Sequence, residues 1–252
     1  MTSAAPNVSD FPRLANLGLS AVLVQFAPKL SGPANAAALA FRAAVEAQGW
    51  EDVIETSTSL TSAYVAFDPL VTDLSTMTTR LQTLLATRDW YKAPLPSGRT
   101  LWRVPVALGG EVGPQFDEAI ALAGVSADQA TQQIAQARLR VMAIGFAPGQ
   151  PYLGELPEAW DIPRQTSLNP QVPAGALVVA VRQLIVFAGP APTGWRHIGQ
   201  TGFRPFLPDA KTPIALTTGD EVQFEPVNVA EMEKLSAEDP AGLGGARAEV
   251  LA

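Results

Sequence analysis

The segment from Ile144 to Arg164 has the composition of a rigid loop that could hold a ligand. Its sequence, IGFAPGQPYLGELPEAWDIPR, alternates glycine and proline with aromatic residues. Because proline fixes the backbone and glycine permits a close approach, four residues are predicted to shape the loop. These are Gly145, Pro148, Gly149 and Pro151. The loop then presents Phe146, Tyr152 and Arg164 as candidate substrate-binding side chains. The same composition also closes the ends of β barrels, and this alternative stays open.

Arg164 has the chemistry to bind an acid. A guanidinium offers two parallel donors to a planar carboxylate, which a lysine ammonium does not. An isolated arginine is also a common member of a surface ion pair. The sequence supports both interpretations.

Trp195 and His197 form a second candidate group in the segment PTGWRHIG. The indole of Trp195 provides a flat stacking wall with one hydrogen-bond donor, although a core tryptophan has the same signature. In a strand, His197 faces the same side as Trp195 and can carry a proton beside that wall. A structural histidine is the alternative, since no carboxylate partner is identifiable in the sequence.

The motifs of several enzyme classes are absent. No G-x-S-x-G elbow is present, and the single histidine would have to serve any serine triad. No phosphate-binding G-x-x-x-x-G-K-[ST] loop is present, and Gly109-Gly110 lacks the spacing of a dinucleotide fingerprint. We therefore expect that this chain alone binds no nucleotide.

Metal binding is also disfavoured. One histidine and no cysteine cannot supply the usual nitrogen and sulfur ligands of zinc. Glu155, Glu158 and Asp161 are near enough in sequence for an oxygen-rich magnesium site, but a solvated acidic loop is the simpler interpretation. We expect no metal site.

Composition and charge limit the partners and the compartment. The formal net charge is −7, and no stretch concentrates Lys and Arg, which argues against nucleic acid and anionic membranes as partners. The first residues, MTSAAPNVSDFPRL, lack the basic start and long apolar core of a signal peptide. No apolar run approaches the roughly 18 residues of a membrane span. Together with the lack of cysteine, these features indicate a soluble, cytoplasmic protein.

Hydrophobic periodicity predicts an N-terminal α+β domain over residues 1–92. A buried strand is expected at 21–26, and a helix follows from Ser31 and Pro33 to Gly49. Two further strands are expected at 53–58 and 63–67, with a second helix after Asp73. The segment KAPLPSGRT then interrupts the pattern.

A second domain is predicted over residues 100–228. Helices are expected near 113–122 and, behind a capping box of Ser126 and Gln129, up to about Leu139. Short apolar runs separated by Gly and Pro predict many strands, as in a barrel or sandwich. These runs are 104–108, 141–144, 177–181, 184–188, 214–216 and 222–224. Residues 229–252 are predicted to form a short helix and a mobile tail.

Five ordered motifs carry a resemblance to a known family. They are IGFAPGQPYLGEL, IPR, VPAG at Val172–Gly175, PTGWRHIG at Pro192–Gly199 and GDEVQF at Gly219–Phe224. In this order, they resemble the family of KipI, allophanate hydrolase subunit 1 and the 5-oxoprolinase B subunit, of the carboxyltransferase-domain subdomain C and D type. The likeness covers about Phe11 to Leu235 and adds Pro173, Gly175 and Gly194 to the predicted loop-shaping residues.

The resemblance implies an α+β fold and a shared function. It implies a small, α/β-sandwich-like N-terminal domain followed by a cyclophilin-like β barrel. It also implies a KipA-type companion subunit and a possible third, ATP-handling subunit. The assembled complex would use ATP and Mg²⁺ to open a small amide, 5-oxoproline, to glutamate, with no cofactor bound by this chain alone.

The resemblance also suggests roles for the candidate residues. Arg164 would bind the acid group of the substrate or stabilise an oxyanion, Tyr152 would orient the substrate, and Trp195 would stack on it. Phe146 and His197 complete the predicted substrate-binding set. Two alternatives stay open: a regulatory module that docks on a histidine kinase, and a paralogue acting on a different amide or acid.

The sequence departs from the family pattern at four positions. Gln150 stands where the pattern G-F-x-P-G-F-P-Y has its second aromatic residue, and Asn169 stands where a second P-R pair ends. Gln115 replaces an acidic residue, and Thr193 replaces the first glycine of G-G-W. Since an asparagine cannot neutralise an anion, Arg164 is left to bind an acid alone.

Overall fold

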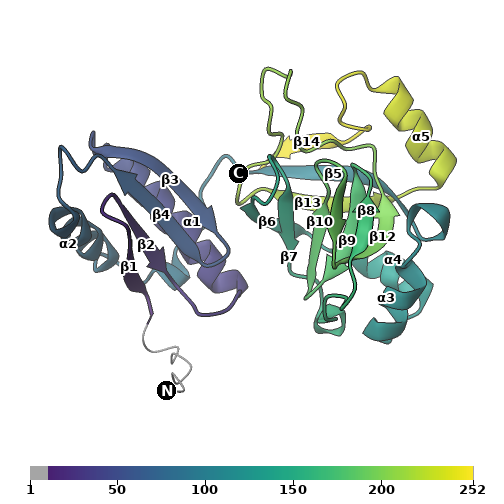
Figure 1. Cartoon of the computed structure of the whole chain (residues 1–252), viewed down its shortest axis with the longest axis horizontal. Helices are drawn as coiled ribbons and strands as arrows, with labels where there is room; N and C mark the ends of the chain where they lie inside the picture. The colour runs from purple at the N-terminus through teal and green to yellow at the C-terminus, as the bar shows by residue number, and fades with distance from the viewer. Residues whose placement is uncertain (1–10, 252) are drawn as a thin grey trace. The chain divides into compact units, whose positions relative to one another are not determined.

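The computed structural model describes residues 11–251, so the leader predicted up to Asp10 lies outside the described residues. The chain divides into two compact units, one ending at Ser97 and the other beginning at Gly98 (Figure 1). Each unit has its own buried core and is described by itself. No helix within residues 11–251 is long and apolar enough to cross a membrane.

The N-terminal unit is an antiparallel sheet of four strands in the order β1-β2-β4-β3. The strands are β1 Arg13–Leu17, β2 Ala21–Gln25, β3 Val53–Ser59 and β4 Ser62–Phe67. The helices are α1 Gly32–Ala47 and α2 Leu74–Leu85, with a short 3₁₀ helix at Trp90–Lys92. One face of the sheet packs on both helices, which gives a two-layer α/β sandwich.

Local sequence explains where these helices begin. The Ser31 side chain caps α1 by accepting a hydrogen bond from a backbone N–H, and Asp73 does the same for α2. Val22 on β2 and Val65 on β4 are paired across the sheet and are fully buried with Phe41 of α1. The predicted order of strand, helix, two strands and helix is therefore present, with β1 added before it.

The C-terminal unit is a closed β barrel of seven strands. Its strands follow the order β12-β9-β10-β7-β6-β13-β5, and β5 closes the ring by pairing with β12. They are β5 Thr100–Leu108, β6 Leu139–Ile144, β7 Pro151–Gly154, β9 Ala176–Ala180, β10 Gln183–Val186, β12 Arg196–Gln200 and β13 Glu221–Pro226. The predicted fold class, a small α+β unit followed by a β barrel, is confirmed.

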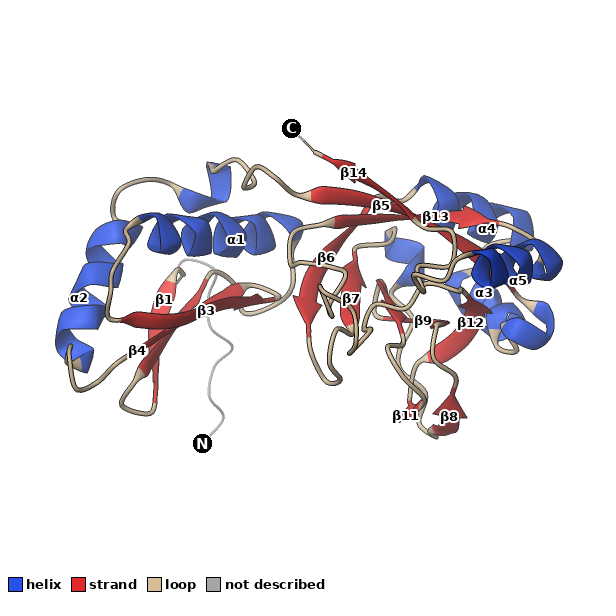
Figure 2. Cartoon of the chain, turned by 90° about the horizontal axis from the view of Figure 1, so that it is seen from above, coloured by secondary structure: helices blue, strands red, loops and turns tan. Residues whose placement is uncertain are grey.

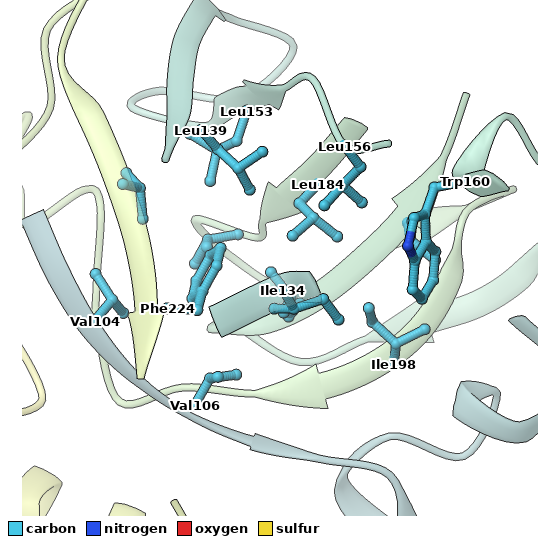
Figure 3. Close-up of a cluster of buried hydrophobic side chains, with 14 of the residues drawn as sticks. Val104, Val106, Ile134, Leu139, Leu153, Leu156, Trp160, Leu184, Ile198 and Phe224 are labelled. Atoms are coloured by element: carbon cyan, nitrogen blue, oxygen red, sulfur yellow. The ribbon is translucent and has the colours of Figure 1, made fainter. Parts of the chain in front are cut away.

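The barrel interior is filled by aliphatic and aromatic side chains that converge from its strands (Figure 3). Leu153, Leu184 and Phe224 are buried there. Helices α3 Phe116–Ala123 and α4 Ala127–Gln136 add residues to the same core, including Ile134 of α4. The capping box predicted at the start of α4 is present.

The remaining elements lie around the barrel (Figure 2). A two-stranded antiparallel ribbon is formed by β8 Asn169–Val172 and β11 Ala191–Thr193. Helix α5 covers Val229–Glu238, and strand β14 covers Arg247–Val250. The strand predicted at 214–216 is wrong, since Ile214 makes only an isolated bridge with Phe206.

The prediction of a mobile tail is wrong for the described residues that follow α5. Strand β14 pairs antiparallel with the first half of β5, beside the part that pairs with β12. The glycines suggested flexibility, but Gly244 has a φ of 60°, and a Cβ there would lie 2.3 Å from the carbonyl carbon of Gly202. These glycines permit close packing of the backbone.

Shortening Ile134 to alanine should destabilise the C-terminal unit. Ile134 has no exposed surface, and its loss leaves a cavity between α4 and the barrel, which costs about 2–5 kcal/mol of unfolding free energy. Chemical denaturation monitored by tryptophan fluorescence measures the change. Ile214→Ala, at a residue that is 40% exposed, is the matched control and should cost much less. Equal losses in the two variants would contradict the assigned core.

Candidate functional site

The outer face of the barrel wall is apolar where β7, β9 and β10 lie side by side. Leu153 on β7 and Leu184 on β10 point into the barrel core, so their neighbours Tyr152 and Ile185 point outward. Tyr152 and Ile185 are paired across these two strands. They belong with Trp195 to a separate apolar cluster outside the barrel. This cluster forms the floor of a pocket.

The pocket has a volume of about 400 Å³, within the range of small-molecule sites. Its lining combines aromatic, aliphatic and uncharged polar side chains with one arginine. The described residues that line it are Phe146, Gln150, Tyr152, Arg164, Gln165, Leu168, Ile185, Phe187, Pro192, Thr193, Gly194 and Trp195. No carboxylate and no histidine is among these residues.

Trp195 is the central side chain of the pocket wall. It is 4% exposed, and its ring meets that of Tyr152 edge-on, with the centroids 6.1 Å apart and the planes at 75°. Its backbone N–H donates to Thr193 Oγ1 at 3.0 Å. The carbonyl of Gly194 accepts a hydrogen bond from the backbone N–H of Gln165 at 2.7 Å. These two hydrogen bonds fix the backbone at Trp195 and at the residue before it.

Arg164 supplies the positive charge of the pocket. The central carbon of its guanidinium lies 5.3 Å from the centroid of the Trp195 ring, in a cation–π contact. No ion pair or side-chain hydrogen bond joins it to any residue in 11–251. The surface ion pair considered from sequence is therefore not found among the described residues. Its donors are free for an acidic ligand.

Tyr152 is a neutral phenol at physiological pH. Burial raises its pKa, while the positive charge of Arg164 and a side-chain hydrogen bond with Gln150 oppose that rise. Because the pKa of tyrosine is about 10 even without burial, Tyr152 does not act as a base near neutrality. It can orient a ligand through its hydroxyl.

Gln150 is a pocket residue that the sequence did not predict as one. Its side chain is 1% exposed, and its Oε1 accepts no hydrogen bond from any residue that the structure describes. The sequence feature that could have identified Gln150 is its position in the glycine-proline loop, where the family pattern has an aromatic residue. Gln165, Leu168 and Thr193 were missed as well, since polar and aliphatic loop residues carry no specific pattern.

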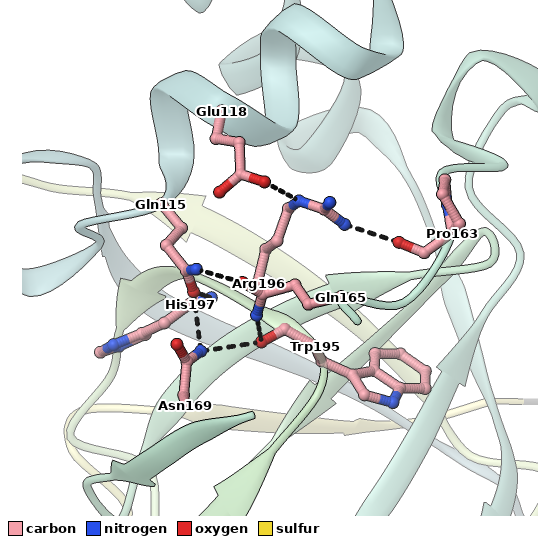
Figure 4. Close-up of polar contacts among 8 residues, drawn as sticks. All are labelled: Gln115, Glu118, Pro163, Gln165, Asn169, Trp195, Arg196 and His197. Carbon is pink, nitrogen blue, oxygen red and sulfur yellow. Dashed lines mark hydrogen bonds and ion pairs between the residues drawn. The ribbon is translucent and has the colours of Figure 1, made fainter. Parts of the chain in front are cut away.

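A network of side-chain amides holds the segment that carries Arg164 (Figure 4). Gln115 donates from Nε2 to Gln165 Oε1 at 2.6 Å and accepts at Oε1 from Asn169 Nδ2 at 2.7 Å. Both Gln165 and Asn169 also donate to the backbone carbonyl of Trp195, each at 3.1 Å. The network ties the 163–169 segment to the residue that forms the pocket wall.

Arg196 fixes the start of the same segment. Its Nε donates to Glu118 Oε1 at 2.8 Å, and its Nη1 donates to the carbonyl of Pro163 at 2.6 Å (Figure 4). The side chain of Arg196 is 8% exposed, so these bonds are shielded from water more than those of a surface pair. Arg164 therefore extends from a backbone anchored immediately before it.

His197 does not line the pocket. Its ring points away from that of Trp195, and its Nε2 lies 3.0 Å from the carbonyl oxygen of Gly199 (Figure 4). Trp195 precedes β12 and so lies outside the strand, which means that strand alternation does not relate the two side chains. Burial lowers the pKa of His197, which keeps its ring neutral.

Of the seven predicted loop-shaping residues, Gly194 is among the described residues that line the pocket. Gly149 has a φ of 70°, and a Cβ there would lie 2.8 Å from the carbonyl oxygen of Pro205. Gly175 is also closely packed, since a Cβ there would lie 2.3 Å from the carbonyl oxygen of Thr201. Phe146 is 76% exposed at the rim. The others are Gly145 and Pro148 in the loop before β7, Pro151 opening β7, Pro173 after β8 and Gly194 before Trp195.

The acidic residues after β7 do not form a cluster. Within residues 11–251, no three Asp, Glu, His or Cys side chains lie close enough to hold a metal ion. Glu155 lies 3.9 Å from Arg182 Nη1, while Glu158 and Asp161 are exposed in and after a 3₁₀ turn. A site assembled from these three residues does not fit the geometry.

Comparison with known proteins identifies the family. The family model described as "Carboxyltransferase domain, subdomain C and D" matches residues 12–216. This chain belongs to that family. The resemblance inferred from the five motifs is therefore confirmed.

Two relatives bear the same name. The 5-oxoprolinase B subunit of Bacillus subtilis (strain 168) is 28% identical over 228 residues, which cover 88% of this chain and 94% of that protein. The 5-oxoprolinase B subunit of Haemophilus influenzae is 30% identical over 177 residues, which cover 70% of this chain and 81% of that protein.

Solved structures share the fold. The crystal structure of TTHA0988 has a TM-score of 0.69 at 26% identity, and the match covers 83% of this chain and 40% of that protein. The chain thus spans less than half of that protein. The K. lactis urea amidolyase has a TM-score of 0.69 at 13% identity, over 92% of this chain and 16% of that protein, which shows a likeness of fold alone.

The effect of the Arg164 charge on Tyr152 predicts a pKa change. Arg164→Ala should raise the pKa of Tyr152 further, because it removes a positive charge that stabilises the phenolate. Ultraviolet titration measures the value, with Tyr152→Phe used to subtract the other tyrosines. Arg247→Ala, which removes a surface arginine outside the pocket, should leave it unchanged. An unchanged or lower pKa in Arg164→Ala would place the guanidinium elsewhere.

Proposed function

We propose that this chain is a non-autonomous subunit of an ATP-dependent amidohydrolase complex that resembles 5-oxoprolinase. It works with a KipA-type companion subunit in the cytoplasm, and its pocket binds a small acid that also carries an amide. The observation that carries the proposal is the unpaired guanidinium of Arg164, held over Trp195 in a pocket that no carboxylate lines. The names of the relatives support the choice of complex.

The pocket chemistry fits substrate binding better than complete catalysis. Opening a stable amide requires activation of its carbonyl and a positioned water. Tyr152 stays protonated near neutrality, and His197 lies outside the pocket. The sequence has no phosphate-binding loop of the common type. We therefore assign ATP, Mg²⁺ and the phosphoryl chemistry to the companion subunits.

The roles of the pocket residues follow from their positions. Arg164 binds the carboxylate of the substrate through two donors, which is worth about 1.5–3 kcal/mol for each charged hydrogen bond. Trp195 supports a flat ring or amide plane, and the hydroxyl of Tyr152 orients it. The exposed side chains of Phe146 and Leu168 at the rim, 76% and 67% exposed, give the companion an apolar surface to cover.

The test is turnover of 5-oxoproline to glutamate with ATP and Mg²⁺. It compares this chain alone, the companion subunits alone and the complete mixture. We expect activity only in the mixture and at least a tenfold loss in Arg164→Ala, which corresponds to about 1.4 kcal/mol of binding. Arg164→Lys should retain part of the activity, since it keeps the charge but loses the fork.

Arg247→Ala is the matched control, because Arg247 is a surface arginine of the same unit that pairs with Glu225. It should behave like the wild type. A stable complex without turnover would overturn the 5-oxoprolinase assignment. In that case, binding of the complex to a histidine kinase, or turnover of another small amide, decides between the two alternatives.

A further inference from the structure

Gln150 lines the pocket with a buried side chain whose amide oxygen is unpaired. Its side chain is 1% exposed and lines the cavity, yet Oε1 has no hydrogen-bond partner among residues 11–251. Buried amide oxygens in folded proteins are almost always paired, because an unpaired one loses its bond with water and gains none in return. On a residue that lines a pocket, such an oxygen is a candidate hydrogen-bond acceptor for a ligand.

The unpaired end of the Gln150 amide is its oxygen, since Oε1 and not Nε2 is among the described buried atoms that lack a hydrogen-bond partner. Gln150 also interacts with its neighbour Tyr152, and that side-chain interaction lowers the pKa of Tyr152 against the rise caused by burial.

Two other side-chain oxygens of the pocket lining already accept hydrogen bonds. Gln165 Oε1 accepts from Gln115 Nε2 at 2.6 Å, and Thr193 Oγ1 accepts from the backbone N–H of Trp195 at 3.0 Å. Arg164 offers only donors. Among the described lining residues, Gln150 Oε1 is therefore the buried side-chain acceptor that remains for a ligand N–H.

We propose that Gln150 is a specificity-determining residue, whose Oε1 accepts a hydrogen bond from the amide N–H of an acidic substrate bound by Arg164. This inference rests on the proposed function, and it adds a preference for one class of substrate. The pocket prefers acids whose amide nitrogen carries a hydrogen over isosteres in which oxygen replaces the N–H group. An ester or lactone oxygen placed there would face Oε1 without a proton between them.

Matched pairs of small acids test this preference. One pair is 5-oxoproline and the lactone in which ring oxygen replaces the N–H group. The second pair is N-acetylglycine and acetoxyacetate. Binding of each acid to the assembled complex is measured by calorimetry without ATP, so that no ligand is consumed. We expect at least about tenfold tighter binding of the N–H member in a pair that binds.

Gln150→Met tests whether Gln150 causes the preference for the N–H member of each pair. Methionine has a similar length but no amide oxygen, so the preference should fall to about threefold or less. Arg164→Ala should weaken both members of a pair about equally and leave their ratio unchanged. Tyr152→Phe is a second variant, at a less buried position. It releases the Gln150 amide to rotate and should lower the ratio even if Gln150→Met fails to fold.

The outcomes separate the two proposals. Binding that depends on Arg164, with a ratio that neither Gln150→Met nor Tyr152→Phe changes, would overturn the role of Gln150 and leave the proposed function intact. The same holds if the wild type binds both members of a pair equally. If no acid of either pair binds the complex, both the proposed function and the role of Gln150 are overturned.

Discussion

The closure of the barrel between β5 and β12 is the interaction on which the rest of the structure depends. It joins Leu108 to Gly199, residues far apart in the chain. A Cβ on Gly199 would lie 2.6 Å from the carbonyl oxygen of Ala107, so glycine is required for the strands to approach. Gly113 makes a similar approach to Ile198. Trp195 lies directly before β12, and its position is therefore set by the closure.

The same region brings together two departures from the family pattern. Gln115 and Asn169 stand where the pattern has an acidic residue and an arginine, and their side chains are hydrogen-bonded to each other at 2.7 Å. From sequence, each change removed a charge from the candidate site. In the structure, the neutral pair holds the segment that carries Arg164 and introduces no carboxylate that could compete for its guanidinium.

Much of the fold and part of the site follow from local sequence patterns. Capping predicted the start of α4, and apolar runs predicted β9 and β10, whereas β7 lies inside the segment 144–164 that was predicted as a loop. Phe146, Arg164 and Trp195 meet in one pocket, but His197 does not line it, and Trp195 lies before β12, where strand alternation does not extend to it. Gln150 could not be predicted, since its importance lies in an absent hydrogen bond. Strand β1 was missed because its residues are mostly exposed and show no apolar alternation.

The position of β5 has a consequence for biosynthesis. It is the first strand of the C-terminal unit, while its partners β12, β13 and β14 are the last three strands described. A ribosome that releases the chain from its N-terminus exposes β5 long before any of these partners exists. The barrel therefore closes only after nearly the whole unit has emerged, and its non-local pairings favour slow folding. The N-terminal unit, whose strands pair with near neighbours, can fold while the barrel is still being made.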